Sequence, residues 1–220
     1  MDLVLSITAS DLIEIVCRIS VVMDKNERYL TDLDAAIGDS DHGINMNRGF
    51  KNAVERLKQG DPRADIESVL MTTGMALIET VGGAAGPLYG MMFTNMAMVS
   101  SGKNKLDKKG LAKAFSEGLK AVQDIGGGTM QGDKTMVDVL FPLVQELNKS
   151  SNDSSVGLIV ALERALRAAE LGLKSTIPIL AKKGRASYLG ERAVGHQDPG
   201  ATSTYLIIKV IYEFVKGKAE

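Results

Sequence analysis

The chain has 220 residues, enough for one large domain or two small ones, and its 26 Lys and Arg nearly balance its 27 Asp and Glu. The resulting net charge of -1 argues against a nucleic-acid-binding protein that relies on bulk positive charge. No segment reaches the roughly 18 uninterrupted apolar residues of a membrane span, residues 1–10 lack the pattern of a signal peptide, and the single cysteine, Cys17, cannot form an internal disulfide. We therefore expect a cytoplasmic protein with no nucleic-acid or membrane partner.

Apolar side chains recur at helical spacing through most of the chain, among residues that favour helices. The first helix is predicted at 9–25, after Thr8 and Asp11 in capping-box spacing. Further helices are predicted at 27–36, 44–58, 64–80, 87–101 (with Pro87 as its first residue), 107–124, 132–148 and 155–172. The last of these is compatible with a kinked extension past Pro178 to Lys183, and an irregular stretch at 184–202 precedes a final helix at 203–216. No internal repeat or long linker divides the chain, so we expect one all-α domain over residues 1–220.

The segment from Leu33 to Gly43 gathers Asp34, Asp39, Asp41 and His42 around Gly38. Such dense negative charge is tolerated only when it is solvated or neutralised by a cation. Carboxylates in a tight turn suit Mg²⁺, which usually keeps waters and phosphate oxygens as further ligands. The alternative is a solvated acidic turn that caps the next helix.

Glycine-bearing loops recur at four helix ends, at 38–43, 82–86, 126–132 and 184–200. Glycine lets backbone amides approach a ligand closely, and helix N-termini favour phosphate. The chain has no P-loop, no protein-kinase catalytic loop, and no G-x-G-x-x-G after a predicted strand. We expect a nucleotide–metal site assembled at one end of a helical bundle.

Five sequence blocks together resemble the L subunit of bacterial dihydroxyacetone kinase. They are DAAIGDSDHGINMNRG at 34–49, GGAAGPL at 82–88, GDKTM at 132–136, GRASYLGER at 184–192 and GHQDPGATS at 195–203. The blocks follow the family's order over nearly the whole chain. The same fold occurs in the N-terminal domain of fatty-acid kinases, but the blocks at 184–203 fit the dihydroxyacetone kinase type better.

The resemblance implies an antiparallel barrel of about eight helices with the nucleotide at one end. It implies that Asp34, Asp39 and Asp41 ligate two Mg²⁺ ions that bridge the phosphates of ADP or ATP, and that the activity belongs to glycerol metabolism. Phosphate would pass to dihydroxyacetone held on a separate K subunit. In one version ADP stays bound as a coenzyme and an M subunit of the phosphotransferase system rephosphorylates it; in the other, ATP exchanges freely and the L and K domains are usually fused. The absence of a K domain from these 220 residues favours the first version, and we also expect a homodimer.

The resemblance also assigns the remaining site residues. His42 joins the catalytic aspartates as a hydrogen-bond partner of phosphate, with a covalent phosphohistidine as an alternative. Other residues are expected to bind the nucleotide, and each has a purely structural turn, cap or surface role as its alternative. Those beside the phosphates are Gly43, Ile44, Asn45, Gly83, Ala84 and Ala85, with Arg185 as a planar donor to phosphate. Those near the nucleoside are Gly127, Thr135 and Met136, and Asp198, Pro199 and Gly200 form a turn over the ribose or base. Ala85 departs from the serine usual in the family.

Two other functions remain open at this point. One is an ATP-dependent kinase subunit for another short ketose, such as erythrulose. The other is a nucleotide-binding regulator of a transcription factor, although an intact trio of aspartates favours catalysis.

Overall fold

Helices dominate residues 5–61 and 63–218, the part of the chain that the computed structural model describes. Within these residues the α-helices are α1 (Ala9–Lys25), α2 (Glu27–Ile37), α3 (His42–Gln59), α4 (Ile66–Thr80), α5 (Ala85–Met98), α6 (Lys108–Ile125), α7 (Val137–Asn152), α8 (Leu158–Ser175) and α9 (Pro199–Gly217), with a 3₁₀-helix, η1 (Arg185–Ala193), before the last. The predicted all-α class is confirmed.

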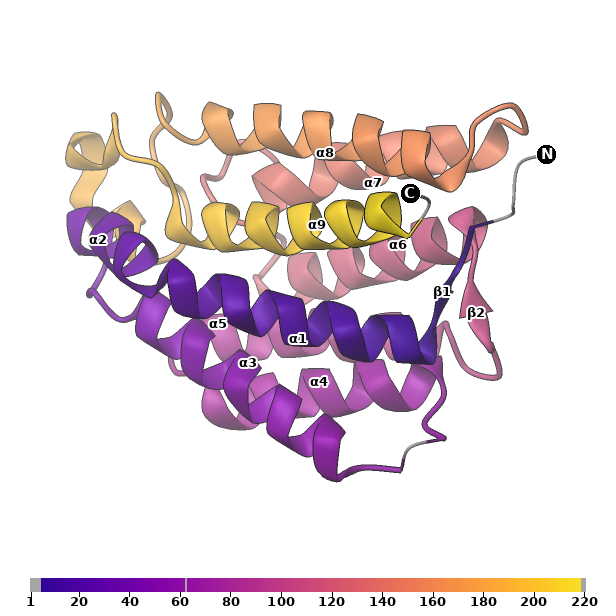
Figure 1. The fold of residues 1–220 in the computed structure, drawn as a ribbon. Helices are drawn as coiled ribbons and strands as arrows, with labels where there is room; N and C mark the ends of the chain where they lie inside the picture. The colour runs from indigo at the N-terminus through magenta and orange to yellow at the C-terminus, as the bar shows by residue number, and fades with distance from the viewer. Residues whose placement is uncertain (1–4, 62, 219–220) are drawn as a thin grey trace.

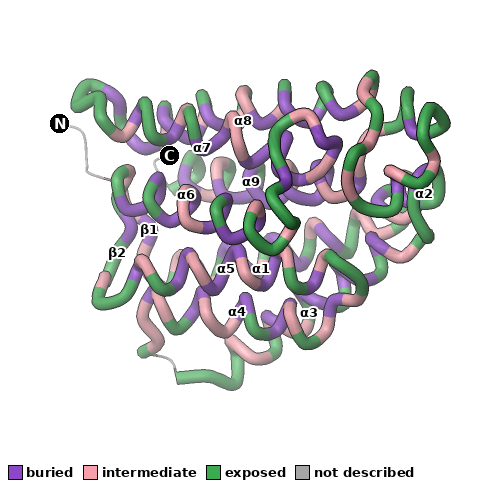
Figure 2. The backbone as a smooth tube through the Cα atoms, turned by 180° about the vertical axis from the view of Figure 1, so that it is seen from behind, coloured by how far each residue is buried: buried purple, intermediate pink, exposed green. Residues whose placement is uncertain are grey.

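The long helices lie side by side and run between two ends of the molecule (Figure 1). Each α-helix from α3 to α8 packs against the next α-helix in the chain, and α9 also packs against α1, which brings the first and last helices together. Their buried faces form one apolar core that includes Phe50, Leu140 and Ile207, and buried positions recur along each helix in Figure 2. The α2 helix and η1 meet at one end of this bundle, where the chain reverses between helices (Figure 1).

Local signals explain where several helices begin and how closely they pack. Thr8 and Asp11 form the predicted capping box of α1. Asp65 caps α4 by accepting a hydrogen bond from the Ser68 amide at 2.8 Å. Glycine at position 74 allows α4 and α5 to pack closely. A Cβ there would stand only 2.8 Å from the Gly90 carbonyl oxygen.

The structure corrects two predicted helix starts near the glycine loops. The α5 helix begins at Ala85, so Pro87 is its third residue and not its first. The α7 helix begins at Val137 instead of 132, because the buried Asp138 carboxylate accepts hydrogen bonds from the amides of Gly132 (2.6 Å) and Thr135 (2.8 Å) and folds the preceding residues into a loop.

The segment between α8 and α9 also differs from the prediction. The α8 helix ends at Ser175 without the extension to Lys183, and the stretch expected to be irregular contains η1. Asp198 caps α9 by accepting from the Ala201 amide at 2.7 Å, and Pro199 fits the first helical position, so this helix starts four residues before the predicted 203.

Two further observations complete the fold. A two-stranded antiparallel sheet, absent from the prediction, pairs β1 (Ile7–Thr8) with β2 (Lys105–Leu106) at the end opposite η1 (Figure 1). None of the helices in the described part of the chain combines the length and the apolar character that a bilayer crossing requires.

Candidate nucleotide and metal site

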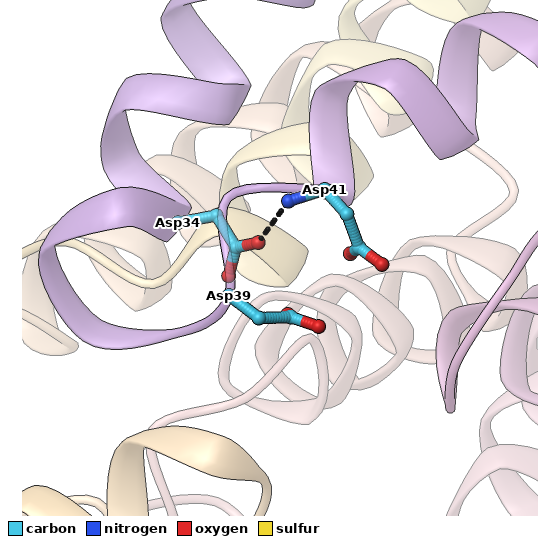
Figure 3. A group of neighbouring side chains, drawn as sticks. All are labelled: Asp34, Asp39 and Asp41. Atoms are coloured by element: carbon cyan, nitrogen blue, oxygen red, sulfur yellow. Dashed lines mark hydrogen bonds between the residues drawn. The ribbon is translucent and has the colours of Figure 1, made fainter.

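Three aspartates converge where α2 passes into α3. Asp34 belongs to α2, Asp39 to the connecting loop, and Asp41 stands just before α3 (Figure 3). One carboxylate oxygen from each lies within 4.8 Å of the other two. The loop folds around Asp34, whose Oδ2 accepts hydrogen bonds from the amides of Asp41 (2.9 Å) and His42 (3.1 Å). The predicted cluster is therefore brought together by local backbone geometry.

Gly38 permits this arrangement. A Cβ at this position would stand 2.8 Å from Asp34 Cγ and closer still to Oδ1, so any side chain would displace the carboxylate. The charge of the cluster meets one cationic side chain among the described residues, because Arg185 pairs with Asp39 at 2.8 Å. Three carboxylates with one guanidinium leave an excess of negative charge that suits a metal cation.

The aspartates border an open cleft at this end of the bundle. Segments far apart in sequence meet there: the α2–α3 loop, the start of α5, the loop before α7, the start of η1, and the start of α9. The predicted site residues that line the cleft are Asp34, Asp39, Asp41, His42, Gly83, Ala84, Ala85, Thr135, Met136, Arg185, Asp198, Pro199 and Gly200.

Four predicted residues do not line the cleft. Gly43 packs tightly on the Glu27 carbonyl, where a Cβ would not fit. Ile44 is half exposed, Asn45 is buried and accepts a hydrogen bond from Arg48 at 2.6 Å, and the Gly127 carbonyl accepts from Lys183 at 2.9 Å. In this structure their roles are helix packing and loop support, and a direct contact with nucleotide stays a prediction.

His42 is buried at the first turn of α3. Its Nε2 lies 2.8 Å from the hydroxyl of Ser203 on α9, which in turn lies 2.7 Å from the buried Tyr89 hydroxyl. Burial lowers the pKa of His42 to about 4, against the opposing effect of Asp34 and Asp41. The ring is therefore neutral at pH 7 and is held in one orientation.

The N-terminus of α5 offers backbone donors to the cleft. No side chain caps this helix in the described part of the chain, since its N-cap residue is Ala84. Gly83 has φ +64°, a conformation that glycine adopts without strain. An uncapped helix N-terminus combines free N–H groups with a partial positive charge, and both favour a phosphate.

A mostly apolar hollow continues from the cleft between α5, α6 and α7. Its walls include Leu88, Val122, Ile125, Met136 and Val137. Leu88 and Met136 border both spaces, so a ligand with a charged end and a flat apolar end can occupy them together. This shape suits a nucleotide, with Met136 as an adaptable wall for the base.

Asp198 is a second residue at the cleft whose pKa is shifted. Burial raises the pKa of its carboxyl to about 7, although the hydrogen bond from the Ala201 amide opposes the shift. In the structure, Asp198, Pro199 and Gly200, the residues of the predicted turn, form the N-cap and first residues of α9.

Sequence reasoning did not place Lys134, Tyr89 or Lys183 among the site residues, yet all three border the cleft. Lys134 lies within the GDKTM block, so the block itself was the available signal. Tyr89 follows the block at 82–88 by one residue, and nothing local marks its hydroxyl as a partner of Ser203, which lies 114 residues away. Lys183 carries no sequence signal that we recognise.

Comparison with known proteins decides the family. The model of the DAK2 domain matches residues 36–213. This range includes all five sequence blocks except Asp34 and Ala35, the first two residues of the first block. The chain belongs to the DAK2 domain family. It is 42% identical over 207 residues to the ADP-binding subunit DhaL of the PEP-dependent dihydroxyacetone kinase of Escherichia coli K12, and the alignment covers 94% of this chain and 97% of that one.

Further members agree with this assignment. The ADP-binding subunit DhaL of PEP-dependent dihydroxyacetone kinase 2 from Listeria innocua is 41% identical, over 89% of each chain. The fold matches that of the C. freundii dihydroxyacetone kinase in complex with AMP-PNP and Mg²⁺, with a TM-score of 0.72 and 24% identity, over 97% of this chain and 36% of that kinase. The resemblance to the L subunits of dihydroxyacetone kinase is confirmed.

Proposed function

We propose that this chain is the ADP-binding subunit of a dihydroxyacetone kinase, which uses a Mg-bound nucleotide to pass a phosphoryl group to dihydroxyacetone on a K subunit. The observation that carries the proposal is the convergence of Asp34, Asp39 and Asp41 within 4.8 Å at the border of the cleft. The E. coli and L. innocua relatives are ADP-binding subunits of dihydroxyacetone kinases, which indicates both the nucleotide and the acceptor. We further propose that the 220 residues act as one nucleotide-binding domain.

The donor set fits Mg²⁺. All three residues offer hard carboxylate oxygens, and the two amides that hold Asp34 both engage Oδ2, which leaves Oδ1 for a cation. Bound Mg²⁺ would neutralise the phosphates and the charge that develops during phosphoryl transfer. A solvated acidic turn explains the cluster less well, because Asp34 is buried.

The remaining residues of the cleft bind and orient the nucleotide. The α5 N-terminus supplies backbone donors to phosphate, and the Arg185 guanidinium, beside Asp39, supplies a planar fork for phosphate oxygens. His42 is neutral and its Nε2 faces Ser203, which supports a fixed hydrogen-bonding role over a phosphohistidine. The apolar hollow beside Met136 takes the base.

The donor and the partners form the finer part of the proposal. We propose that an M-type subunit of the phosphotransferase system rephosphorylates ADP in place, because the chain matches 97% of the length of a PEP-dependent subunit. A homodimer is also expected, and the mass of the purified protein in solution tests it. An ATP-dependent kinase subunit for erythrulose, or a regulator without catalysis, would be outcomes of the experiment below.

The test begins with the nucleotide that the purified protein carries. Near-stoichiometric ADP released on denaturation supports a resident coenzyme, whereas an empty site that exchanges ATP rapidly supports the ATP-dependent kinase. Transfer to dihydroxyacetone is then measured with K and M subunits added, for the wild type and for Asp39→Asn.

The matched control is Asp32→Asn, the same chemical change on α2, the helix that precedes the loop of Asp39. The Asp32 carboxylate is 68% exposed, and in the described part of the chain its one ion pair is with Arg28 at 3.8 Å. We expect Asp39→Asn to lose at least about 100-fold in transfer rate and Asp32→Asn to keep it, since surface ion pairs contribute little. Full transfer by Asp39→Asn would refute the metal assignment, and binding without transfer in the wild type would favour the regulator.

A further inference from the structure

Lys134 occupies an unusual position beneath the cleft. It lies in the loop between α6 and α7, and its side chain is almost fully buried, with 1% of the residue exposed. Its φ is +63°, a conformation that is strained for any residue with a Cβ. A buried lysine in a strained backbone requires compensating contacts, so those contacts indicate its role.

Within the described part of the chain, the hydrogen-bond partners of this ammonium are main-chain carbonyls. Nζ donates to the carbonyl oxygens of Thr176 (2.5 Å) and His196 (2.6 Å), and it lies 3.3 Å and 3.5 Å from those of Ile179 and Ile177. Thr176 is the C-cap of α8, where carbonyls carry partial negative charge. Among the described residues, no carboxylate pairs directly with this ammonium.

These contacts join three segments that would otherwise be independent loops. Backbone hydrogen bonds run alongside the ammonium, from the Lys182 amide to the Asp133 carbonyl (3.1 Å) and from the Gly195 amide to the Ile177 carbonyl (2.8 Å). The Asp198 amide also donates to Thr176 Oγ1 at 3.2 Å. Lys134 is thus the central link of a loop clamp formed by residues 133–136, 176–183 and 195–198.

Each segment of the loop clamp leads directly into a different wall of the cleft. Thr135 and Met136 follow Lys134 itself, Gly184 and Arg185 follow the second segment, and Pro199 follows the third. Because the ammonium donates to main-chain carbonyls, we expect it to act on the nucleotide through these walls.

We propose that Lys134 is a positioning residue that sets how long a nucleotide stays bound, by tying together the three loops that enclose it. The proposal rests on the nucleotide-binding function above. Loops that are ordered before binding lower the entropic cost of holding a ligand, and loops released from one another raise its dissociation rate.

The test is the dissociation rate of radiolabelled ADP, chased with unlabelled ADP in the presence of Mg²⁺, well below the unfolding temperature. Lys134→Met keeps the apolar stem and removes the donors, and we expect release at least about tenfold faster than in the wild type. Lys149→Met makes the same change on an α7 side chain that is 77% exposed and lies outside the loop clamp, and it should leave the rate unchanged. Leu147→Ala, a core change on α7, provides a variant of lowered melting temperature without damage to the loop clamp.

Release from Lys134→Met at the wild-type rate, or no faster than from Leu147→Ala, would overturn the proposal and leave Lys134 a purely stabilising residue. If Lys134→Met does not fold, amide hydrogen exchange of the wild-type chain decides. The amides of Lys182, Gly195 and Asp198 should open as one unit, with protection that agrees within about tenfold, both without nucleotide and with Mg·ADP. Independent opening of these amides would overturn the loop clamp, and this result does not depend on whether ADP binds.

Discussion

Gly38→Ala tests whether the backbone next to Asp34 controls the metal cluster. The added Cβ would place Asp34 Cγ at 2.8 Å, whereas ordinary contact begins at 3.4 Å, and Oδ1 would lie closer still. The carboxylate must therefore retreat by roughly 1 Å, a displacement that costs about 100-fold when it affects a reacting group. Because Oδ2 also holds the amides of Asp41 and His42, the retreat would disturb the whole loop.

We expect Gly38→Ala to reduce transfer to dihydroxyacetone about 100-fold and to weaken metal binding, while stability falls by about 1–3 kcal/mol. Titration with Mn²⁺ followed by electron paramagnetic resonance measures the metal directly, and thermal unfolding measures the stability. Gly60→Ala is the matched control, because its Cβ would have no neighbour closer than 3.4 Å and its φ of -76° suits alanine. Wild-type metal affinity and transfer in Gly38→Ala would show that the close approach at Asp34 does not shape the cluster.

Two further predictions concern the ends of α5 and α9. Ala85→Ser restores the hydroxyl usual in the family at the α5 N-terminus. One added hydrogen bond contributes about 0.5–1.5 kcal/mol and should lower the Kd for Mg·ADP, measured by calorimetry, by roughly two- to tenfold. An unchanged Kd would show that the backbone amides suffice. The pKa of Asp198 is raised from 3.8 to about 7, so the folded chain binds this proton more tightly than the unfolded chain. The protonated Asp198 therefore contributes fully to stability below about pH 4, and this contribution is lost as the pH rises through 7. Asp198→Asn keeps an N-cap side chain without this titration, so its melting temperature should gain on that of the wild type between pH 4.5 and 7.5, and a constant difference across that range would contradict the assigned pKa.

The helices follow from local sequence, which explains how well they could be predicted. The α1 helix was placed at its observed bounds, because both the apolar spacing and the Thr8–Asp11 capping box lie within a few residues. Errors gathered where a side chain holds the backbone of a loop through hydrogen bonds. The α7 helix starts late because Asp138 folds the loop before it, and the segment after α8 is shaped by its contacts with the Lys134 ammonium.

The candidate site divides in the same way. Asp34, Asp39 and Asp41 lie within eight residues, so a single loop gathers them and the sequence alone could predict a metal cluster. Neither the neutral state of His42, which follows from burial, nor its orientation, which follows from a hydroxyl 161 residues away, could be predicted. Gly43 and Asn45 of the same block are also predicted to bind the nucleotide. In the structure Gly43 packs on the Glu27 carbonyl and Asn45 accepts from Arg48, so their contact with the nucleotide stays a prediction.

The sequence by itself determined the helical class, the family and the local acidic loop, because periodicity, capping and short motifs act over a few residues. Only the tertiary structure decided which loops meet at the cleft and which lysine ties them together. Hydrogen bonds such as those of Lys134 to Thr176 and His196 join groups 42 and 62 residues apart, and such pairings form only once the helices have packed.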